Sequence, residues 1–151
     1  MKIVAQNKKA YHDYSVLDTI EAGVVLSGDE VKSLRLGHAQ LKGSFARITK
    51  DEIYLFNVHI SLYMQAYDKQ RDEEYTTRNR KLLLHKRQIK RLVQDVACKG
   101  ITLVPLKLYF NGRGLVKVAI GLCKGKKNVD KRASIKEKDI KRQTARELKN
   151  S

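Results

Sequence analysis

The sequence lacks most of the residues on which small metal sites, disulfide frameworks and membrane spans depend. It has no tryptophan, one proline (Pro105) and two cysteines among 151 residues. Cys98 and Cys123 lie far apart, without a second Cys or a His at metal-ligand spacing, so we expect two reduced cysteines and no bound metal. No apolar run approaches the roughly 20 residues of a membrane span, and the first residues lack the apolar stretch of a secretory signal. These absences predict a cytoplasmic protein that carries no cofactor.

Recognisable catalytic motifs are also missing. The four histidines are dispersed, and none is paired with a Cys or Ser at catalytic spacing: His12, His38, His59 and His85. Four acids in the first fifth of the chain could in principle form a two-metal nuclease site: Asp18, Glu21, Asp29 and Glu30. Roles as a turn residue, a polar strand residue and the first turn of a helix explain them more simply. The sequence therefore favours a binding protein over an enzyme, with the nuclease as an alternative.

Acidic residues are in short supply. The chain has 32 Lys and Arg against 16 Asp and Glu, a formal net charge of +16 and a pI near 9.9. Charge of this size predicts partners and association rates rather than a fold. Nucleic acid fits best, an anionic membrane surface comes second and an acidic protein third. A basic surface without a dedicated partner is the remaining alternative.

The hydrophobic pattern is mostly that of short strands. Alternation and turn residues predict strands over 14–17, 20–26, 44–49, 53–56, 101–110 and 115–122, with Val58 and Ile60 extending the pattern. Pro105 suggests an edge position or a bulge, and Asn111-Gly112 predicts a hairpin. One short helix should follow the capping cluster at 27–29 and end at Gly37, and a second should contain an apolar stripe over 89–96. Residues 68–77 have no periodicity and predict a mobile loop.

This order of elements predicts a mainly β fold without βαβ alternation. The architecture that fits is a small antiparallel closed barrel, like the five-stranded oligonucleotide-binding (OB) type, with two or three flanking helices. We assign residues 1–123 to this RNA-binding barrel domain and residues 124–151 to a basic C-terminal tail. The protein is expected to be a monomer.

The tail carries eleven Lys and Arg against four acids, a net charge of +7, and no aromatic residue. It cannot bury enough apolar surface to offset its ordering entropy, so it should be disordered when free. Ser134 and Glu137 form a capping box, and Glu137 with Lys141 is a favourable i,i+4 pair. We therefore expect the tail to become helical when it binds a phosphate-rich surface.

Two further basic clusters lie within the barrel domain. Residues 7–9 (NKK) stand beside Tyr11, His12 and Tyr14, which combines cations with rings that can stack on bases. Residues 78–91 contain seven cations and no acid: Arg78, Arg80, Lys81, Lys86, Arg87, Lys90 and Arg91. Ordinary solvated helix faces alternate in sign. This cluster therefore favours a phosphate-contacting surface over a plain solvated one.

Five ordered motifs resemble one bacterial family. They are residues 7–14 (NKKAYHDY), 21–23 (EAG), 28–35 (GDEVKSLR), 80–85 (RKLLLH) and 125–132 (GKKNVDKR). The sequence resembles small protein B, the family of SsrA-binding proteins that partner transfer-messenger RNA. The resemblance covers essentially the whole chain.

The resemblance implies an OB-like barrel that binds the transfer-RNA-like domain of transfer-messenger RNA and promotes its alanylation. It also implies delivery of that RNA, with an elongation factor, to stalled ribosomes, where a degradation tag is added (trans-translation, or ribosome rescue). The elongation factor and the alanyl-tRNA synthetase would be reached through the RNA. The tail would enter the vacant messenger channel and decoding centre of the small ribosomal subunit. A general RNA chaperone or another ribosome-associated RNA-binding protein is the alternative.

The matching motifs also imply the site residues. The RNA-binding set is His12, Glu21, Arg35, Lys81, Leu83 and His85, and the ribosome-engaging set in the tail is Lys126, Lys127, Asp130, Lys131 and Arg132. A carboxylate such as Glu21 can accept from a guanine edge or a 2′-hydroxyl, which a cation cannot do. Family members often have His or Tyr where this chain has Val129, and some have tryptophan where it has Ile140. Stacking at position 129 is therefore lost, while the charge of the tail remains.

Overall fold

The structure is a computed structural model that describes residues 1–63, 73–98 and 100–126. The described strands are β1 (Lys2–Gln6), β2 (Tyr14–Val24), β3 (Ala39–Gln40), β4 (Phe45–Thr49), β5 (Glu52–Phe56), β6 (His59–Ile60), β7 (Arg80–Leu83), β8 (Ile101–Phe110) and β9 (Val116–Gly125). The described helices are α1 (Lys8–Asp13), α2 (Gly28–Arg35), α3 (Glu73–Thr76) and α4 (Lys86–Val96).

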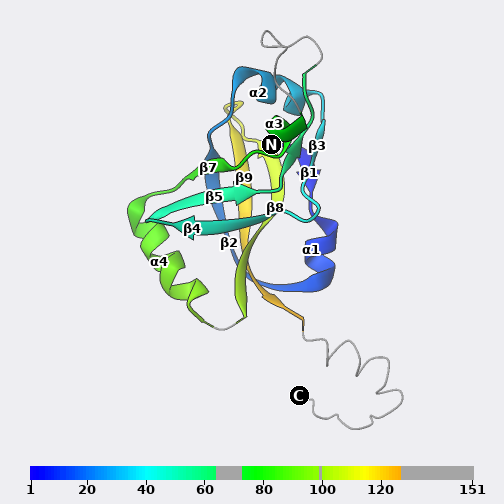
Figure 1. Cartoon of the computed structure of the whole chain (residues 1–151). Coiled ribbons are helices and arrows are strands. Elements are labelled where there is room, and N and C mark those ends of the chain that lie inside the picture. The colour runs from blue at the N-terminus through cyan, green and yellow to red at the C-terminus, as the bar shows by residue number, and fades with distance from the viewer. Residues whose placement is uncertain (64–72, 99, 127–151) are drawn as a thin grey trace, which may run out of the picture.

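Six of these strands close into an antiparallel ring (Figure 1). Their order is β8-β4-β5-β7-β2-β9, and β9 pairs with β8 to complete the circle. The edge of β8 away from β9 is shared, because Leu103 pairs with Ala46 of β4 while residues 107–110 pair with β1. The prediction of a mainly β, antiparallel closed barrel with few helices is confirmed. The described ring has one strand more than the five-stranded type that was expected.

The first long strand is continuous, where the sequence predicted two. β2 pairs with β9 from Tyr14↔Gly125 to Gly23↔Lys117, and the register shifts between Val16 and Asp18. The Thr19 N–H donates to the Asp18 carboxylate at 2.8 Å directly after this irregularity. The polar pair that indicated a turn therefore lies within the strand, next to a bulge at Leu17, because pairing with β9 continues on both sides of the bulge.

Four elements near the basic clusters were not predicted. Residues 80–83 are strand β7 rather than the approach to a helix, because β2 and β5 pair with them from both sides.

β1 and α1 precede the first predicted strand. The Asn7 side chain accepts from the Ala10 N–H and donates to the Leu41 and Pro105 carbonyls, which anchors the start of α1 on the barrel. The segment predicted as a loop contains α3, and its residues 68–72 lie outside the described part.

Other local predictions are confirmed. Ser27 and Glu30 form a capping box at the start of α2, and Gly37 ends the helix with φ +79°. The β4–β5 hairpin forms where it was predicted, and β8 bulges between Pro105 and Lys107. β9 differs from its prediction, because it extends to Gly125, two residues beyond the predicted domain boundary.

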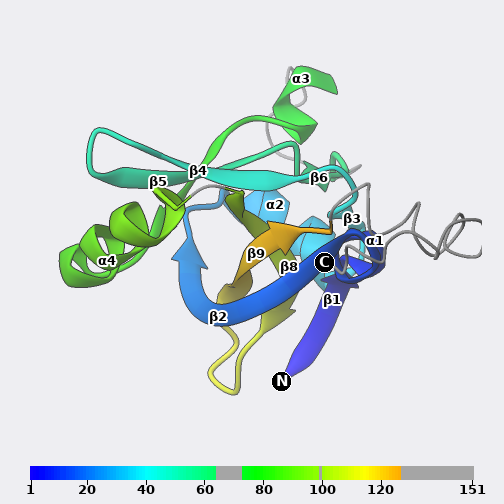
Figure 2. The same cartoon turned by 90° about the horizontal axis from the view of Figure 1, so that it is seen from below.

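The barrel interior is apolar and closely packed. The inward side chains of three ring strands, β5, β7 and β9, are almost fully buried: Ile53, Leu55, Leu82, Val118 and Ile120. α4 covers one end of the barrel with Ile89 and Leu92 (Figure 2). Because neighbouring residues of a strand point to opposite faces, this interior fixes which side chains point outward. No helix in the described ranges is long and apolar enough to span a membrane.

Candidate nucleic-acid interface

The outer face where β2 meets β7 brings together several of the residues that the sequence singled out. Gly23 pairs with Leu83, so Glu21 and Leu83 lie diagonally on the outer face. Leu83 is 53% exposed, which is unusual for a large apolar side chain in a strand. A Cβ atom at position 23 would lie 3.3 Å from the Leu83 Cβ, so only glycine leaves Leu83 in this position without a shift. We call Glu21, Leu83 and their outer-face neighbours the β2–β7 face.

Tyr109 on β8 holds the Glu21 carboxylate. Its hydroxyl donates to Glu21 Oε2 across β9, where Ala119 is the partner of Glu21 and Lys117 is the partner of Tyr109. The tyrosine ring is 7% exposed. Burial, followed by the hydrogen bond and charge of Glu21, raises the pKa of Tyr109 to about 12. The hydroxyl therefore stays protonated at neutral pH and remains a donor to Glu21.

Two residues of the β2–β7 face were missed from the sequence. Lys117 pairs with both Gly23 and Tyr109, so it stands beside Glu21 on the outer face, and Tyr109 lies beyond it. Alternation in the predicted strand 115–122 could have found Lys117, since Val118 and Ile120 point inward. Tyr109 gave no such signal, because β8 is apolar almost throughout and its bulge changes which residues point outward.

Lys81 and His85 lie next to this face. Lys81 is two residues before Leu83 on the same side of β7, and its ammonium pairs with Glu52 at 2.6 Å. Both side chains of that pair are about two-fifths exposed (43% and 39%), so the pair is weak and a phosphate can replace the carboxylate. His85 is exposed directly before α4, and its N–H donates to Gln88 Oε1 at 3.0 Å. The structure thus groups four of the six predicted RNA-binding residues.

His12 and Arg35 lie away from that group. His12 is on α1, before the start of β2, and its imidazole lies 3.0 Å from the Asp13 carboxylate. At about 3.3 Å per strand residue, Tyr14 and Glu21 are separated by roughly 20 Å along β2. Arg35 is exposed at the end of α2, where its carbonyl accepts from Lys2. Only an RNA that covers a broad part of the barrel can contact all six residues.

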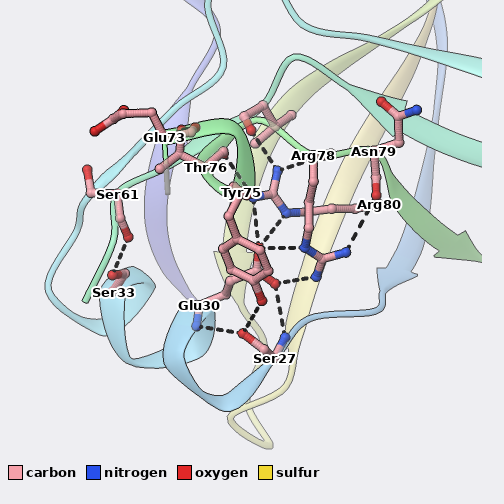
Figure 3. A network of polar contacts seen from close by, with 11 residues as sticks. Ser27, Glu30, Ser33, Ser61, Glu73, Tyr75, Thr76, Arg78, Asn79 and Arg80 are labelled. Carbon is pink, nitrogen blue, oxygen red and sulfur yellow. Dashed lines mark hydrogen bonds and ion pairs between the residues drawn. The ribbon is translucent and has the colours of Figure 1, made fainter. Parts of the chain in front are cut away.

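Arg80 does not belong to the phosphate-contacting cluster in which the sequence placed it. Its side chain is 1% exposed, and its guanidinium meets the buried Glu30 carboxylate at 2.8 Å. It also donates to the carbonyl of Val58 and to that of Thr76 (Figure 3). Arg78 is partly buried and pairs with the same carboxylate. A local count of cations cannot show this, because the partner acid lies 50 residues earlier in the chain.

The pKa values follow from this network. Burial alone would raise the pKa of Glu30, but hydrogen bonds from Arg78 and from the Ser27 N–H, with the charge of Arg80, hold it below its ordinary value. Burial is the main reason that the pKa of Arg80 is lowered. Glu30 is therefore a charged structural residue that fastens α2 to the segment leading into β7.

The four acids considered for a nuclease site do not gather. Glu30 is inside the ion-pair network, Glu21 is held by Tyr109, and Asp18 accepts from the Thr19 N–H on β2. Within the described ranges no group of three His, Cys, Asp or Glu could hold a metal ion. The arrangement of these acids gives the nuclease alternative no support.

Only the root of the tail falls inside the described residues. Gly125 pairs with Tyr14, and the Lys126 N–H donates to the Asp13 carbonyl at 3.1 Å. The tail therefore leaves the barrel beside α1. Lys127, Asp130, Lys131 and Arg132, and the predicted tail helix, lie outside the described residues.

Comparisons with known proteins agree on one family. A family model described as "SmpB protein" matches residues 4–150. SsrA-binding proteins of Enterococcus faecalis and Coprothermobacter proteolyticus are 53% and 50% identical to this chain; each match covers 99% of this chain, and 95% and 98% of the relatives. A chain from the solved structure "tmRNA-SmpB: a journey to the center of the bacterial ribosome" is 47% identical, with a TM-score of 0.68 over 86% of this chain and 92% of that chain.

Proposed function

This chain belongs to the SmpB protein family, and on that premise we propose that it binds transfer-messenger RNA and delivers it to stalled ribosomes for trans-translation. The observation that carries the proposal is the match along nearly the whole chain, joined to the grouping of Glu21, Lys81, Leu83 and His85. Trans-translation adds a degradation tag to the incomplete peptide and frees the ribosome. The protein would act as an adaptor without catalysis, in the cytoplasm and as a monomer.

The β2–β7 face would bind the transfer-RNA-like domain. Leu83 offers an apolar surface that can pack under a sugar or base, and Glu21 offers an acceptor for a guanine edge or a 2′-hydroxyl. Lys117 and Lys81 supply positive charge for the flanking phosphates. His12 and Arg35 would contact the same RNA at its margins, because they lie away from this face.

The tail would engage the small ribosomal subunit. Lys126, Lys127, Asp130, Lys131 and Arg132 match the family's ribosome-engaging motif, and the net charge of +7 suits a channel lined with phosphates. The tail would enter the messenger channel only when message is absent. The elongation factor and the alanyl-tRNA synthetase would meet this protein through the RNA.

The proposal is tested by sequencing the RNA that co-purifies with the protein from its own cells. We expect one transfer-messenger RNA to dominate, and we expect the double substitution Glu21→Gln, His85→Ala to reduce its enrichment about tenfold or more, since a hydrogen bond to a charged group is lost. Asp51→Asn is the control, because it also removes an exposed carboxylate but lies in the β4–β5 turn. A broad mixture of RNAs would instead support a general RNA chaperone.

Tyr109→Phe tests whether the hydroxyl positions Glu21 for the RNA. We expect the affinity for transfer-messenger RNA to fall about three- to tenfold, because the carboxylate loses its donor and can rotate. The same substitution in a Glu21→Gln protein should change little, because the two residues act through one hydrogen bond. Tyr11→Phe, which removes an exposed hydroxyl on α1, is the control. If Tyr109→Phe reduced the affinity equally in the unaltered protein and in the Glu21→Gln protein, Tyr109 would act only on the fold.

A further inference from the structure

A pair of aromatic rings stands on the outer face of the β4–β5 hairpin. Phe45 and Phe56 are cross-strand partners, and their rings stack with centroids 5.1 Å apart and planes 3° apart. Their neighbours Ala46 and Leu55 are buried, so both rings lie on the outer side of the barrel, where they are partly exposed.

Arg47 completes the aromatic pair. Its guanidinium carbon lies 5.3 Å from the Phe45 centroid and 5.6 Å from the Phe56 centroid, within cation–π range of both. Arg47 is exposed, and no carboxylate in the described part of the chain pairs with it. Its charge therefore remains open to an anion, next to a flat apolar surface.

The pair borders an open hollow between α1 and the start of β4. The cavity has a volume of about 340 Å³, and its walls include Lys9, Tyr14, Phe45, Arg47, Thr102 and Val104. That volume falls in the range of sites that hold small organic groups. Phe45 lines the hollow and Phe56 stacks on it, so a flat group that enters meets the first ring of an existing stack. Lys9 pairs with Asp13 at 3.2 Å but is well exposed, so a phosphate can recruit it.

The hollow lies between the two separated parts of the candidate interface. β4 begins on the side of the barrel where α1 lies, and the β4–β5 turn points toward α4 (Figures 1 and 2). Along the outer face Arg47 pairs with Tyr54, which pairs with Lys81 of β7. Lys81 and Arg47 therefore lie in one row across the outer face, which leads from the β2–β7 face across the hairpin to the hollow beside α1.

We propose that this hollow binds an unpaired nucleotide of single-stranded RNA, with the base stacked on Phe45 and the phosphate beside Arg47 and Lys9. Every base has a flat face that a phenylalanine ring can match, and cations next to the ring bind the backbone. An acidic peptide would use the cations but not the aromatic stack. The inference rests on the proposed function in one respect only, namely that the partner is RNA. The nucleotide belongs to a segment outside the base-paired region that the β2–β7 face would contact.

The test uses the full chain and an unstructured ten-nucleotide RNA that carries one 4-thiouridine. We expect Phe45→Leu to weaken binding about five- to a hundredfold, as the loss of one base–aromatic stack predicts. Phe45→Tyr keeps the ring and should bind like the unaltered protein. Arg47→Ala should weaken binding and also reduce the salt dependence by about one phosphate contact. Photo-crosslinks from the 4-thiouridine should map to the peptide that contains Phe45.

Thr49→Ala is the matched control, because Thr49 is exposed on the same face of the same strand. Equal binding by the Phe45→Leu and Thr49→Ala proteins would overturn the proposal. The proposal would also be overturned if Phe45→Leu weakened the binding of an acidic peptide and left the binding of the RNA unchanged. A failure of the proposed function would be seen in a different measurement, the enrichment of transfer-messenger RNA, which depends on the β2–β7 face. A Phe45→Leu protein that enriches that RNA yet loses the ten-nucleotide RNA is the expected outcome.

Discussion

Removal of residues 127–151 is expected to abolish peptide tagging while binding of transfer-messenger RNA stays within about threefold of the full chain. The reason is a division of labour: the residues grouped on the β2–β7 face all precede the tail. The loss of positive charge accounts for the small change in affinity, since each phosphate contact contributes to binding. Tagging is measured in a translation reaction on a message without a stop codon, and affinity by gel shift at fixed salt.

The position of the cut matters for this experiment. Gly125 pairs with Tyr14, and the Lys126 N–H donates to the Asp13 carbonyl, so a cut after Lys126 leaves the β2–β9 ladder whole. A full-length chain in which Lys131 and Arg132 become Gln separates two effects of the cut, because it keeps the length of the tail and lowers its charge. A truncated protein that lost RNA binding and tagging to the same degree would contradict the division of labour.

Arg80→Ala should cost about 3–5 kcal/mol of folding free energy, because it removes one partner of a buried ion pair. The Glu30 carboxylate would keep Arg78, while the carbonyls of Val58 and Thr76 would lose their donor. A loss of that size is a large fraction of the 5–15 kcal/mol that stabilises most domains. Urea unfolding followed by circular dichroism measures it. Arg78→Ala is the matched control and should cost less, because Arg78 is 31% exposed.

The same pair predicts how stability depends on pH. The pKa of Glu30 is lower in the folded state than its ordinary value of 4.5. The charged carboxylate therefore contributes fully to the free energy of unfolding above pH 4.5. The contribution is lost as the pH falls through the lower, folded-state pKa. Unfolding free energies measured from pH 7 down to about 3 should therefore fall less steeply for Arg80→Ala than for the unaltered chain.

For the urea experiment, an equal loss of unfolding free energy in Arg78→Ala and Arg80→Ala would show that the burial of Arg80 does not decide the size of the loss.

Local signals in the sequence predicted the elements that local interactions hold. The capping of α2 at residues 27–29, the stop at Gly37 and the β4–β5 hairpin depend on neighbouring residues, and the structure has them where they were expected. β7 was missed because its strand character comes from β2 and β5, which lie far away in the sequence. The barrel was predicted as a class, but the place of β7 in its ring was not.

The candidate site divides in the same way. Glu21, Leu83 and His85 came from motifs that resemble a family, and the structure places them near one another. Arg80 was assigned to the wrong class because nothing near it in the sequence indicates that Glu30 neutralises it. Tyr109 could not be predicted, since its contact with Glu21 joins residues 88 positions apart. Charge and motif thus identify candidate residues, whereas burial and long-range pairing decide which of them can reach an RNA.

The nine paired positions of β2 and β9 have one mechanical consequence. The root of the tail stands at one end of this double strand and Gly23, beside Leu83, at the other, so the body works as a rigid spacer. If the protein acts as proposed, the offset between the β2–β7 face and the root of the tail would stay constant during the passage of the RNA through a ribosome. Any change of distance would then have to occur outside this double strand.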